Sequence, residues 1–211
     1  MINDIKYIYI PSPFHSLYSV AKDAVIMMTI TTDLIYFRYL TEEDAPALLS
    51  LMHRNRAHFE PFTITRPDSF YTLEEQTARI RMWDENRSAD KSYNFGLFFK
   101  ENDELIGELS LFHVAREPAH KCMMGYCLDH AYQGKGIMSQ AARLALDFAF
   151  DEAGFHRVEA GVMPHNVGSI RVLEKAGFQR EGIARKNVKI NGVWQDHVMF
   201  AILEEDERPR S

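Results

Sequence analysis

A short glycine-rich segment has the clearest chemical potential in this sequence. Residues 133–139 read Gln-Gly-Lys-Gly-Ile-Met-Ser and lie between an expected strand and an expected helix. Gly134 and Gly136 let the backbone turn sharply and approach a ligand without interference from Cβ atoms. The helix that follows directs its unpaired N–H groups and its positive dipole end at this turn. The segment therefore predicts a diphosphate-binding loop, to which Lys135 could add a charge.

Two common phosphate-binding motifs do not describe this segment. A dinucleotide-binding fingerprint needs a glycine at the sixth position of G-x-G-x-x-G, where this chain has Ser139. A Walker loop needs Ser or Thr directly after its Gly-Lys, and here Lys135 is followed by Gly136. A glycine-rich strand-to-helix connection that binds no ligand stays open as the plain alternative.

A second polar segment, Pro-His-Asn-Val-Gly-Ser, follows at residues 164–169. Asn166 and Ser169 are three positions apart, so they share a face at the start of the next expected helix. Their side chains would reach a ligand that extends from the first loop. Asn166 also suits the N-cap of that helix, a role that is compatible with ligand contact.

The other residues that could bind a metal or act as nucleophiles form no convincing site. The histidines lack H-x-x-x-H spacing and the cysteines lack C-x-x-C spacing, so no metal site is expected. Cys122 and Cys127 are five positions apart in one expected strand and should point to opposite faces. Nothing near Cys127 in the sequence would lower its thiol pKa, which argues against a covalent role.

Hydrophobic periodicity and capping signals define the elements that position these segments. The Asn-Gly pair at 191–192, between branched and aromatic residues, is the strongest hairpin signal. Capping boxes at 41–44 and 72–75 open two helices. Further helices are expected over 137–153 and 166–176, and strands over 30–40, 93–100, 105–114, 121–129 and 157–162. This order predicts an α+β fold, a mixed and mostly antiparallel sheet with helices on both faces.

Length and charge restrict the kind of protein. The 211 residues carry 24 Lys and Arg against 30 Asp and Glu, a formal charge of −6. This acidic balance argues against direct nucleic-acid binding and against binding to an anionic membrane, and it suits a basic peptide or amine. No apolar run approaches the roughly 20 residues of a membrane helix. The sequence lacks a convincing secretory signal, so a cytoplasmic location is expected.

The expected organisation is a single domain over 29–205, followed by a polar tail over 206–211. Residues 1–28 form an N-terminal extension of open role. Met27 and Met28 stand directly before the first patterned strand and offer an alternative start of translation.

The two polar segments together resemble the GNAT family of acyl-CoA N-acyltransferases. Residues 133–139 look like its Q/R-x-x-G-x-G/A loop, and residues 166–178 look like its N-x-x-(A/S)…G-F segment. Met138 departs from the general pattern, in which Gly or Ala is usual. It is similar, however, to the Rim-type branch, which acetylates the N-terminal alanine of ribosomal proteins. Segments 32–34, 55–59, 163–166 and 191–198 also resemble that branch, and the likeness covers about residues 30–205.

The resemblance implies a GNAT fold, acetyl-CoA as cosubstrate and direct transfer of acetyl to an amine. Pyrophosphate would bind the N–H groups of residues 134–139, and the pantetheine would lie where two neighbouring strands splay apart. A backbone N–H near Cys127 or Leu128 would face the thioester carbonyl and the oxyanion formed on attack. The expected cofactor-binding residues are Cys127, Leu128, Gln133, Gly134, Lys135, Gly136, Ile137, Met138, Ser139, Asn166 and Ser169.

The catalytic groups are less well defined by the resemblance. The Tyr that many GNAT enzymes use as general acid is replaced by Leu173, and Ser169 matches the Ser that Rim-type relatives are thought to use. Ser169 could equally be a helix-surface hydroxyl that binds the cofactor or the backbone. Positions that hold a Glu base in relatives correspond to Gly161 and Val188. Glu108 and Glu159 are the alternative bases, and of these Glu108 is the chosen candidate.

A weak base would suffice for one class of acceptor. An α-amino group has a pKa of about 7.7–8.0, against about 10.4 for Lys, and each unit costs about 1.4 kcal/mol. Deprotonation near neutrality therefore costs under roughly 1.5 kcal/mol for an N-terminus and over about 4 kcal/mol for lysine. The sequence thus favours acetyl transfer to a protein N-terminal α-amine, an alanine of a ribosomal protein. A small-amine or antibiotic acetyltransferase, and a non-catalytic acetyl-CoA-binding module, stay open as alternatives.

Overall fold

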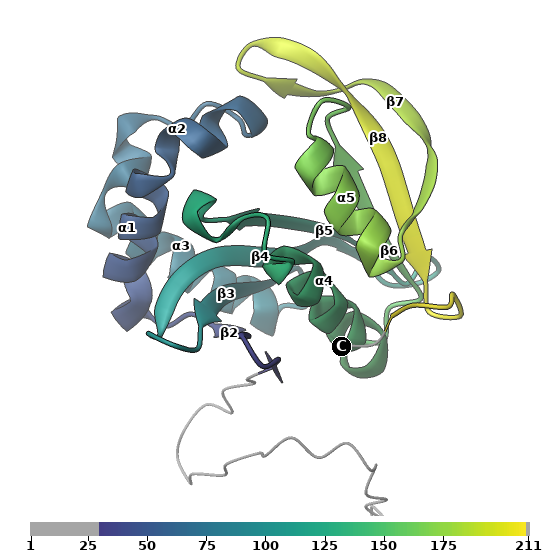
Figure 1. Ribbon diagram of the computed structural model, residues 1–211, viewed down its shortest axis with the longest axis horizontal. Helices are drawn as coiled ribbons and strands as arrows, with labels where there is room; N and C mark the ends of the chain where they lie inside the picture. Colours follow the sequence, from purple (N-terminus) through teal and green to yellow (C-terminus); the bar gives the residue numbers. More distant parts are fainter. Residues whose placement is uncertain (1–29, 210–211) are drawn as a thin grey trace, which may run out of the picture.

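The computed structural model describes residues 30–209, so the expected N-terminal extension and both candidate start methionines lie outside the described residues. Eight strands form one sheet in the order β1-β2-β3-β4-β5-β6-β8-β7 (Figure 1). Their bounds are β1 Ile30–Thr31, β2 Ile35–Tyr39, β3 Tyr93–Phe99, β4 Glu104–Ala115, β5 Lys121–Leu128, β6 Arg157–Val162, β7 Gln179–Ile190 and β8 Val193–Leu203.

Helices cover both faces of this sheet, which confirms the expected α+β architecture. Helices α1 and α3 pack with β3 and β4 around one apolar cluster, whereas α4 packs on the opposite face against β2 and β4. The bounds are α1 Ala45–Arg54, α2 Arg56–Phe59, α3 Leu73–Ser88, α4 Ile137–Asp147 and α5 Val167–Ala176. Within residues 30–209 no helix combines the length and apolar character that spanning a bilayer requires.

The junction between β5 and β6 divides the sheet into two halves. All other strand pairs are antiparallel, but β5 and β6 are parallel and pair only from Lys121–Met123 to Arg157–Glu159. Beyond Met123 the two strands diverge, and the backbone of the last part of β5 has no strand beside it on that side. The two strands therefore splay apart, as the resemblance implied.

Two sequence predictions were wrong in detail. Residues 30–40 do not form one strand, because β1 turns back to pair with β2, Ile30 lying opposite Phe37. The Thr32 hydroxyl accepts hydrogen bonds from the N–H groups of Leu34 and Ile35, and this stabilises the turn. The helix expected over 137–153 is α-helical only to Asp147 and continues as a π-helical turn over Phe148–Glu152.

The hairpin of β7 and β8 turns at Asn191 and Gly192, as predicted. Both residues have positive φ, 47° and 81°, which the tight turn requires. The Asn191 side chain also donates to the Glu60 carbonyl at 2.9 Å and accepts from the Thr65 hydroxyl at 2.8 Å. The hairpin tip is thereby joined to the loop that follows α2, across the gap between the two halves (Figure 1).

The start of the expected polar tail packs against the domain. Arg208 lies over the Phe150 ring at 4.7 Å and is within 3.5 Å of Asp147 and 3.7 Å of Asp151. Its guanidinium is therefore held at the end of α4, where cations also interact favourably with the helix dipole.

Candidate active site

The glycine-rich loop has the backbone conformation of an anion-binding turn. Gly134 and Gly136 have φ of 73° and 77°, and a Cβ built at either position meets no atom within 4 Å. The Gln140 N–H donates to the Gly136 carbonyl, so Gly136 is the N-cap of α4. The preceding N–H groups of the first helical turn have no carbonyl within the helix to bond. The loop thus offers open space beside unpaired donors, which fits a phosphate group.

The side chains of this segment divide into two groups. Residues 133–136 are exposed, whereas Ile137, Met138 and Ser139 are buried in the helix. Met138 belongs to the main apolar cluster, so its contribution to a ligand would come from its backbone. The Lys135 ammonium lies 5.1 Å from the centre of the Tyr132 ring, at the edge of the loop.

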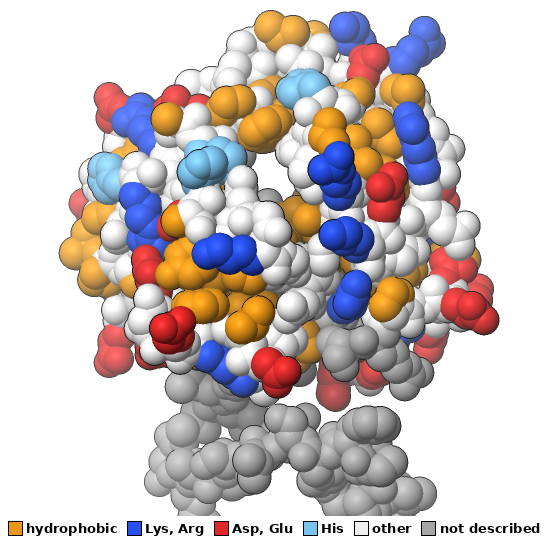
Figure 2. Space-filling view, in the orientation of Figure 1, with side chains coloured by type: hydrophobic (Ala, Val, Ile, Leu, Met, Phe, Trp, Pro, Cys, Tyr) orange, Lys and Arg blue, Asp and Glu red, His pale blue; other side chains and the backbone are white. Residues whose placement is uncertain are grey.

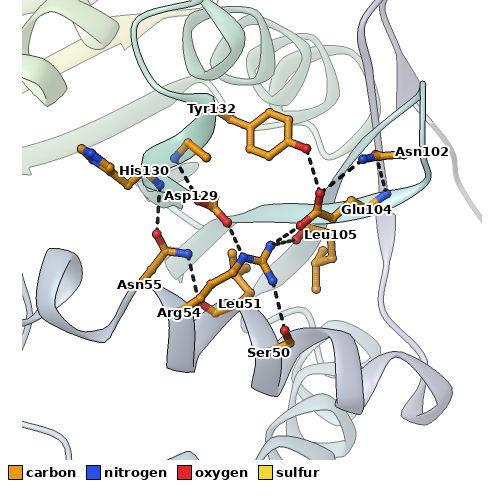
Figure 3. Close-up of polar contacts among 11 residues, drawn as sticks. Ser50, Leu51, Arg54, Asn55, Asn102, Glu104, Leu105, Asp129, His130 and Tyr132 are labelled. Carbon is orange, nitrogen blue, oxygen red and sulfur yellow. Dashed lines mark hydrogen bonds and ion pairs between the residues drawn. The ribbon is translucent and has the colours of Figure 1, made fainter.

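A polar network fixes the segment that leads from β5 into this loop (Figure 3). Arg54 of α1 forms an ion pair with Asp129 and another, at 3.0 Å, with Glu104. Asp129 in turn accepts from the Ala131 N–H at 3.0 Å, and Glu104 accepts from the Tyr132 hydroxyl at 2.8 Å. Burial would raise the pKa of Asp129, but the hydrogen bonds from Arg54 and the Ala131 N–H outweigh it, and the pKa is lowered. Asp129 is therefore held as a carboxylate.

Two residues near the end of α1 and in α2 also hold the segment that follows β5. Asn55 accepts from the His130 N–H at 2.9 Å and donates to the Leu51 carbonyl at 3.1 Å. His58 lies 2.6 Å from the Gln133 amide through their side-chain nitrogens. The polar atoms of Asn55 and His58 therefore contact the segment that follows β5. Helices α1 and α2 thus position the expected cofactor loop.

The end of β5 directs a backbone N–H group into the space where β5 and β6 diverge, which we call the splay. The Asp129 N–H bonds to the Ile106 carbonyl of β4 at 2.7 Å. Successive N–H groups of an antiparallel strand alternate in direction, so the Leu128 N–H points away from β4. It therefore faces the side where β5 has parted from β6, whereas the Cys127 N–H points toward β4.

Cys127 lies on the other face of the sheet from Cys122, as expected. Its thiol donates to Glu108 at 3.6 Å, and burial together with that carboxylate raises its thiol pKa well above the ordinary value. Cys122 is buried in the main apolar cluster. Neither thiol is activated as a nucleophile.

Ser169 and Asn166 lie at the start of α5, across the splay from β5. Asn166 is the N-cap and accepts from the Ser169 N–H at 3.2 Å. The Ser169 and Tyr126 hydroxyl oxygens are 2.8 Å apart, and Tyr126 also donates to the Ser169 carbonyl at 3.1 Å. A phenol has one proton, so the Ser169 hydroxyl then donates to Tyr126. Burial raises the pKa of Tyr126 to about 12, which keeps the phenol protonated.

A pocket of about 340 Å³ opens on the face of the sheet that carries α1 and α3. Glu108 of β4 lies in its wall and forms an ion pair with Arg79 of α3 at 3.2 Å. Tyr126 also lines the pocket, and its hydroxyl lies against Ser169 of α5. The aromatic lining residues are Phe59, Phe70, Tyr71, Trp83, Phe112 and Tyr126.

The space-filling view shows the molecule hollowed between the two halves of the sheet (Figure 2). Blue basic side chains gather over α5 and α4, beside this hollow. Positive charge beside the hollow favours the binding of a polyanionic cofactor there.

The second candidate base lies elsewhere. Glu159 bonds to Lys121 at 3.1 Å and to Arg157 at 2.8 Å, in a surface ion-pair cluster on β5 and β6. Burial would raise the pKa of Glu159, but Arg157 and Lys121 outweigh it and lower the pKa. Glu159 is therefore an ion-pair partner in the sheet, and Glu108 is the carboxylate in the pocket.

Sequence reasoning missed several residues of this region. Tyr126 is the one hydroxyl-bearing residue among apolar neighbours on its strand face, a signal that the sequence offered. Arg54, Arg66 and Arg79 come from distant segments, and nothing in their local pattern links them to the site. Within residues 30–209 no three His, Cys, Asp or Glu side chains gather as a metal site would require.

Comparisons with known proteins agree with this geometry. Residues 35–179 match the Acetyltransferase (GNAT) domain. The chain is 53% identical over 173 residues to "Probable N-acetyltransferase YjcK" of Bacillus subtilis (strain 168), covering 82% of this chain and 96% of the relative. It is 33% identical over 188 residues to "[Ribosomal protein uS5]-alanine N-acetyltransferase" of Escherichia coli (strain K12), covering 89% of this chain and 97% of that enzyme.

Solved structures share the fold. The ribosomal-protein-S5-alanine acetyltransferase from Vibrio fischeri superposes with a TM-score of 0.81 at 32% identity, covering 86% of this chain and 100% of the other. Mycobacterium smegmatis RimJ, solved with CoA-disulfide, has a TM-score of 0.78 at 23% identity and covers 82% of this chain and 85% of its own. The expected cosubstrate, acetyl-CoA, is thus of the kind that structures of this fold hold. By sequence and by fold, this chain belongs to the GNAT family of N-acetyltransferases.

Proposed function

We propose that this enzyme transfers acetyl from acetyl-CoA to the α-amine of a protein N-terminus. The acceptor that the comparisons favour is an N-terminal alanine of a ribosomal protein, because two similar proteins are named for that reaction on uS5 or S5. A ribosomal acceptor would place the reaction in the cytoplasm. The proposal rests on one observation above all: Ser169 contacts the hydroxyl of Tyr126, a residue of β5 that also lines the pocket containing Glu108.

The residues of the loop and the splay would hold the cosubstrate. The N–H groups of residues 134–139 would donate to the diphosphate, since open space lies beside Gly134 and Gly136. The Leu128 N–H would donate to the thioester carbonyl and stabilise negative charge on its oxygen. Acetyl-CoA supplies an activated acetyl group and a thiolate leaving group. Direct transfer to the amine agrees with the raised pKa of Cys127, which argues against an acetylated cysteine.

One hydroxyl group and one carboxyl group would move the protons. Ser169, held by Tyr126 and by the Asn166 cap, would turn its hydroxyl hydrogen from Tyr126 to the leaving thiolate and give up the proton, and the Tyr126 phenol would then donate to the Ser169 oxygen. Glu108 would accept the proton of the amine through an ordered water in the pocket. A carboxylate is an intrinsically weak base, and the ion pair with Arg79 holds Glu108 in place. A weak base suits an α-amine, whose pKa of about 7.7–8.0 lies near neutrality, better than a lysine.

The test is incubation of the protein with acetyl-CoA and a panel of amines. An Ala-initiated peptide should release free CoA thiol and gain one acetyl group on its α-amine, located by mass spectrometry. The matched control is the same peptide with a blocked N-terminus and one lysine, which should react far more slowly. Binding of acetyl-CoA without thiol release would indicate a non-catalytic module instead. Reaction of small amines alone would indicate a small-amine or antibiotic acetyltransferase.

A further inference from the structure

The charges in the pocket do not balance. Its wall holds two guanidinium groups, those of Arg66 and Arg79, but one carboxylate, that of Glu108. Arg79 is satisfied, because it bonds to Glu108 at 3.2 Å and to Gln76 at 2.5 Å and lies over the Trp83 ring at 4.7 Å. One positive charge is therefore left without a counter-charge.

Arg66 carries that charge. Its guanidinium lies over the Phe70 ring at 4.6 Å, and within residues 30–209 no hydrogen bond or ion pair satisfies its N–H groups. Burial lowers the pKa of Arg66, and the nearby positive charge of Arg79 lowers it further. Glu108 acts in the opposite direction without restoring the ordinary value. The charge of the Arg66 guanidinium is therefore poorly compensated at this position, and a bound anion would stabilise it.

Arg66 is also held for bidentate recognition. Contact with the Phe70 ring restrains the guanidinium, whose N–H fork matches a carboxylate better than a single amine or hydroxyl. The chain around it is restricted as well, since Pro67 follows and Thr65 bonds to Asn191 of the β7–β8 hairpin at 2.8 Å. A group fixed in this way loses little freedom when it binds.

We propose that the acceptor carries a carboxylate close to its reacting amine, that Arg66 binds this carboxylate, and that Glu108 faces the amine. The inference rests on the proposed function and names the class of peptide that the site prefers. Arg66 and Glu108 line the same pocket of about 340 Å³, so one short acceptor residue or two can reach both. The carboxylate can belong to an acidic side chain next to the N-terminal alanine or to the free C-terminus of a very short acceptor.

This local preference is compatible with the overall charge of the protein. A net charge of −6 attracts a basic protein from a distance, whereas the pocket contacts only the first residues of the acceptor. An N-terminal segment that is acidic at its start and basic further along would satisfy both.

The experiment compares kcat/KM for two amidated peptides that differ only at the second position, Ala-Glu and Ala-Gln. The wild-type enzyme should prefer the Ala-Glu peptide about tenfold, which corresponds to about 1.4 kcal/mol. Arg66→Gln should abolish that preference, so that the two peptides react with kcat/KM values within about twofold of each other. Arg81→Gln is the matched control, because Arg81 is paired with Glu42 outside the pocket. It should retain the full preference.

The outcomes separate this inference from the proposed function. Acetylation of both peptides at equal rates by the wild type would overturn the inference and leave α-amine transfer intact. A preference for Glu that survives Arg66→Gln would overturn the role of Arg66. If neither peptide reacts, the proposed function fails and the inference fails with it. The free-acid Ala-Gln dipeptide, compared with its amide, shows whether a terminal carboxylate can replace the acidic side chain.

Discussion

Gly136 offers a direct test of the diphosphate-binding loop. In Gly136→Ala the added methyl meets no protein atom within 4 Å, so the variant loses stability only through its backbone, which must hold φ at 77°. An alanine in this left-handed conformation costs roughly 1–2 kcal/mol. For a domain of this size each kcal/mol lowers Tm by about 2–4 °C, so a decrease of about 2–8 °C is expected.

Gly136→Ala should also weaken acetyl-CoA binding, independently of its effect on stability. The methyl would project into the open space beside the first N–H groups of α4, where the diphosphate is proposed to lie. Loss of one hydrogen bond to a charged group costs about 1.5–3 kcal/mol. Since about 1.4 kcal/mol is a factor of ten, the Kd for acetyl-CoA should rise roughly ten- to hundredfold. Isothermal titration calorimetry on the folded variant measures this directly.

Gly154 provides a matched control, because its φ is 65° and its Cβ position is equally open. It lies between the π-helical turn and β6, away from the loop. Gly154→Ala should therefore lose a similar amount of stability and bind acetyl-CoA as tightly as the wild type. If both variants keep the wild-type Kd, the diphosphate does not lie on this loop and the reasoning is refuted.

Three further substitutions test other parts of the site. Ser169→Ala should lower kcat about a hundredfold, as loss of a general acid does, while calorimetry shows unchanged acetyl-CoA affinity; parallel losses of both would make Ser169 a cofactor contact. Asp129→Asn should lower the free energy of unfolding by roughly 1–3 kcal/mol at pH 7. Because the pKa of Asp129 is lowered in the folded state, its stabilisation is fully present above the ordinary value of 3.8 and is lost as the pH falls through the lower folded-state value. The difference in free energy of unfolding between variant and wild type in urea titrations should therefore shrink progressively below pH 3.8; a difference that does not shrink as the pH falls would contradict the ion pair with Arg54. Asn191→Gly keeps the turn but removes two bonds to the loop before Arg66, so KM for the peptide should rise several-fold with little change in Tm; an unaltered KM would show that the hairpin does not support the pocket.

Much of the fold follows from local signals in the sequence. The capping residues Thr41 and Thr72 and the Asn-Gly hairpin turn lie where the patterns indicated. Such signals act over a few residues, so the sequence contains them explicitly. The strand expected over 30–40 was wrong because its alternation continues through Thr32, whose side-chain hydrogen bonds impose the turn.

The site was only partly predictable, for a physical reason. Its backbone donors are set by glycine positions and helix starts, which are local. Its side-chain environment depends on pairings across the fold, such as Tyr126 with Ser169, 43 residues apart, and Arg54 with Asp129, 75 residues apart. The local sequence around an arginine cannot show that Arg54 holds a loop while Arg66 has no hydrogen-bonding partner among residues 30–209. Three-dimensional packing decides which charges are satisfied.

The parting of β5 from β6 has a kinetic consequence. It leaves a window through the sheet, with the α4 helix start on one face and the pocket on the other. Acetyl-CoA and the acceptor amine can then enter from opposite faces of the sheet without competing for one entrance. Both can therefore be bound together when the acetyl group is transferred. Double-reciprocal plots at several acetyl-CoA concentrations should accordingly intersect, the signature of a ternary complex, instead of running parallel as they would for an enzyme that carries the acetyl group itself.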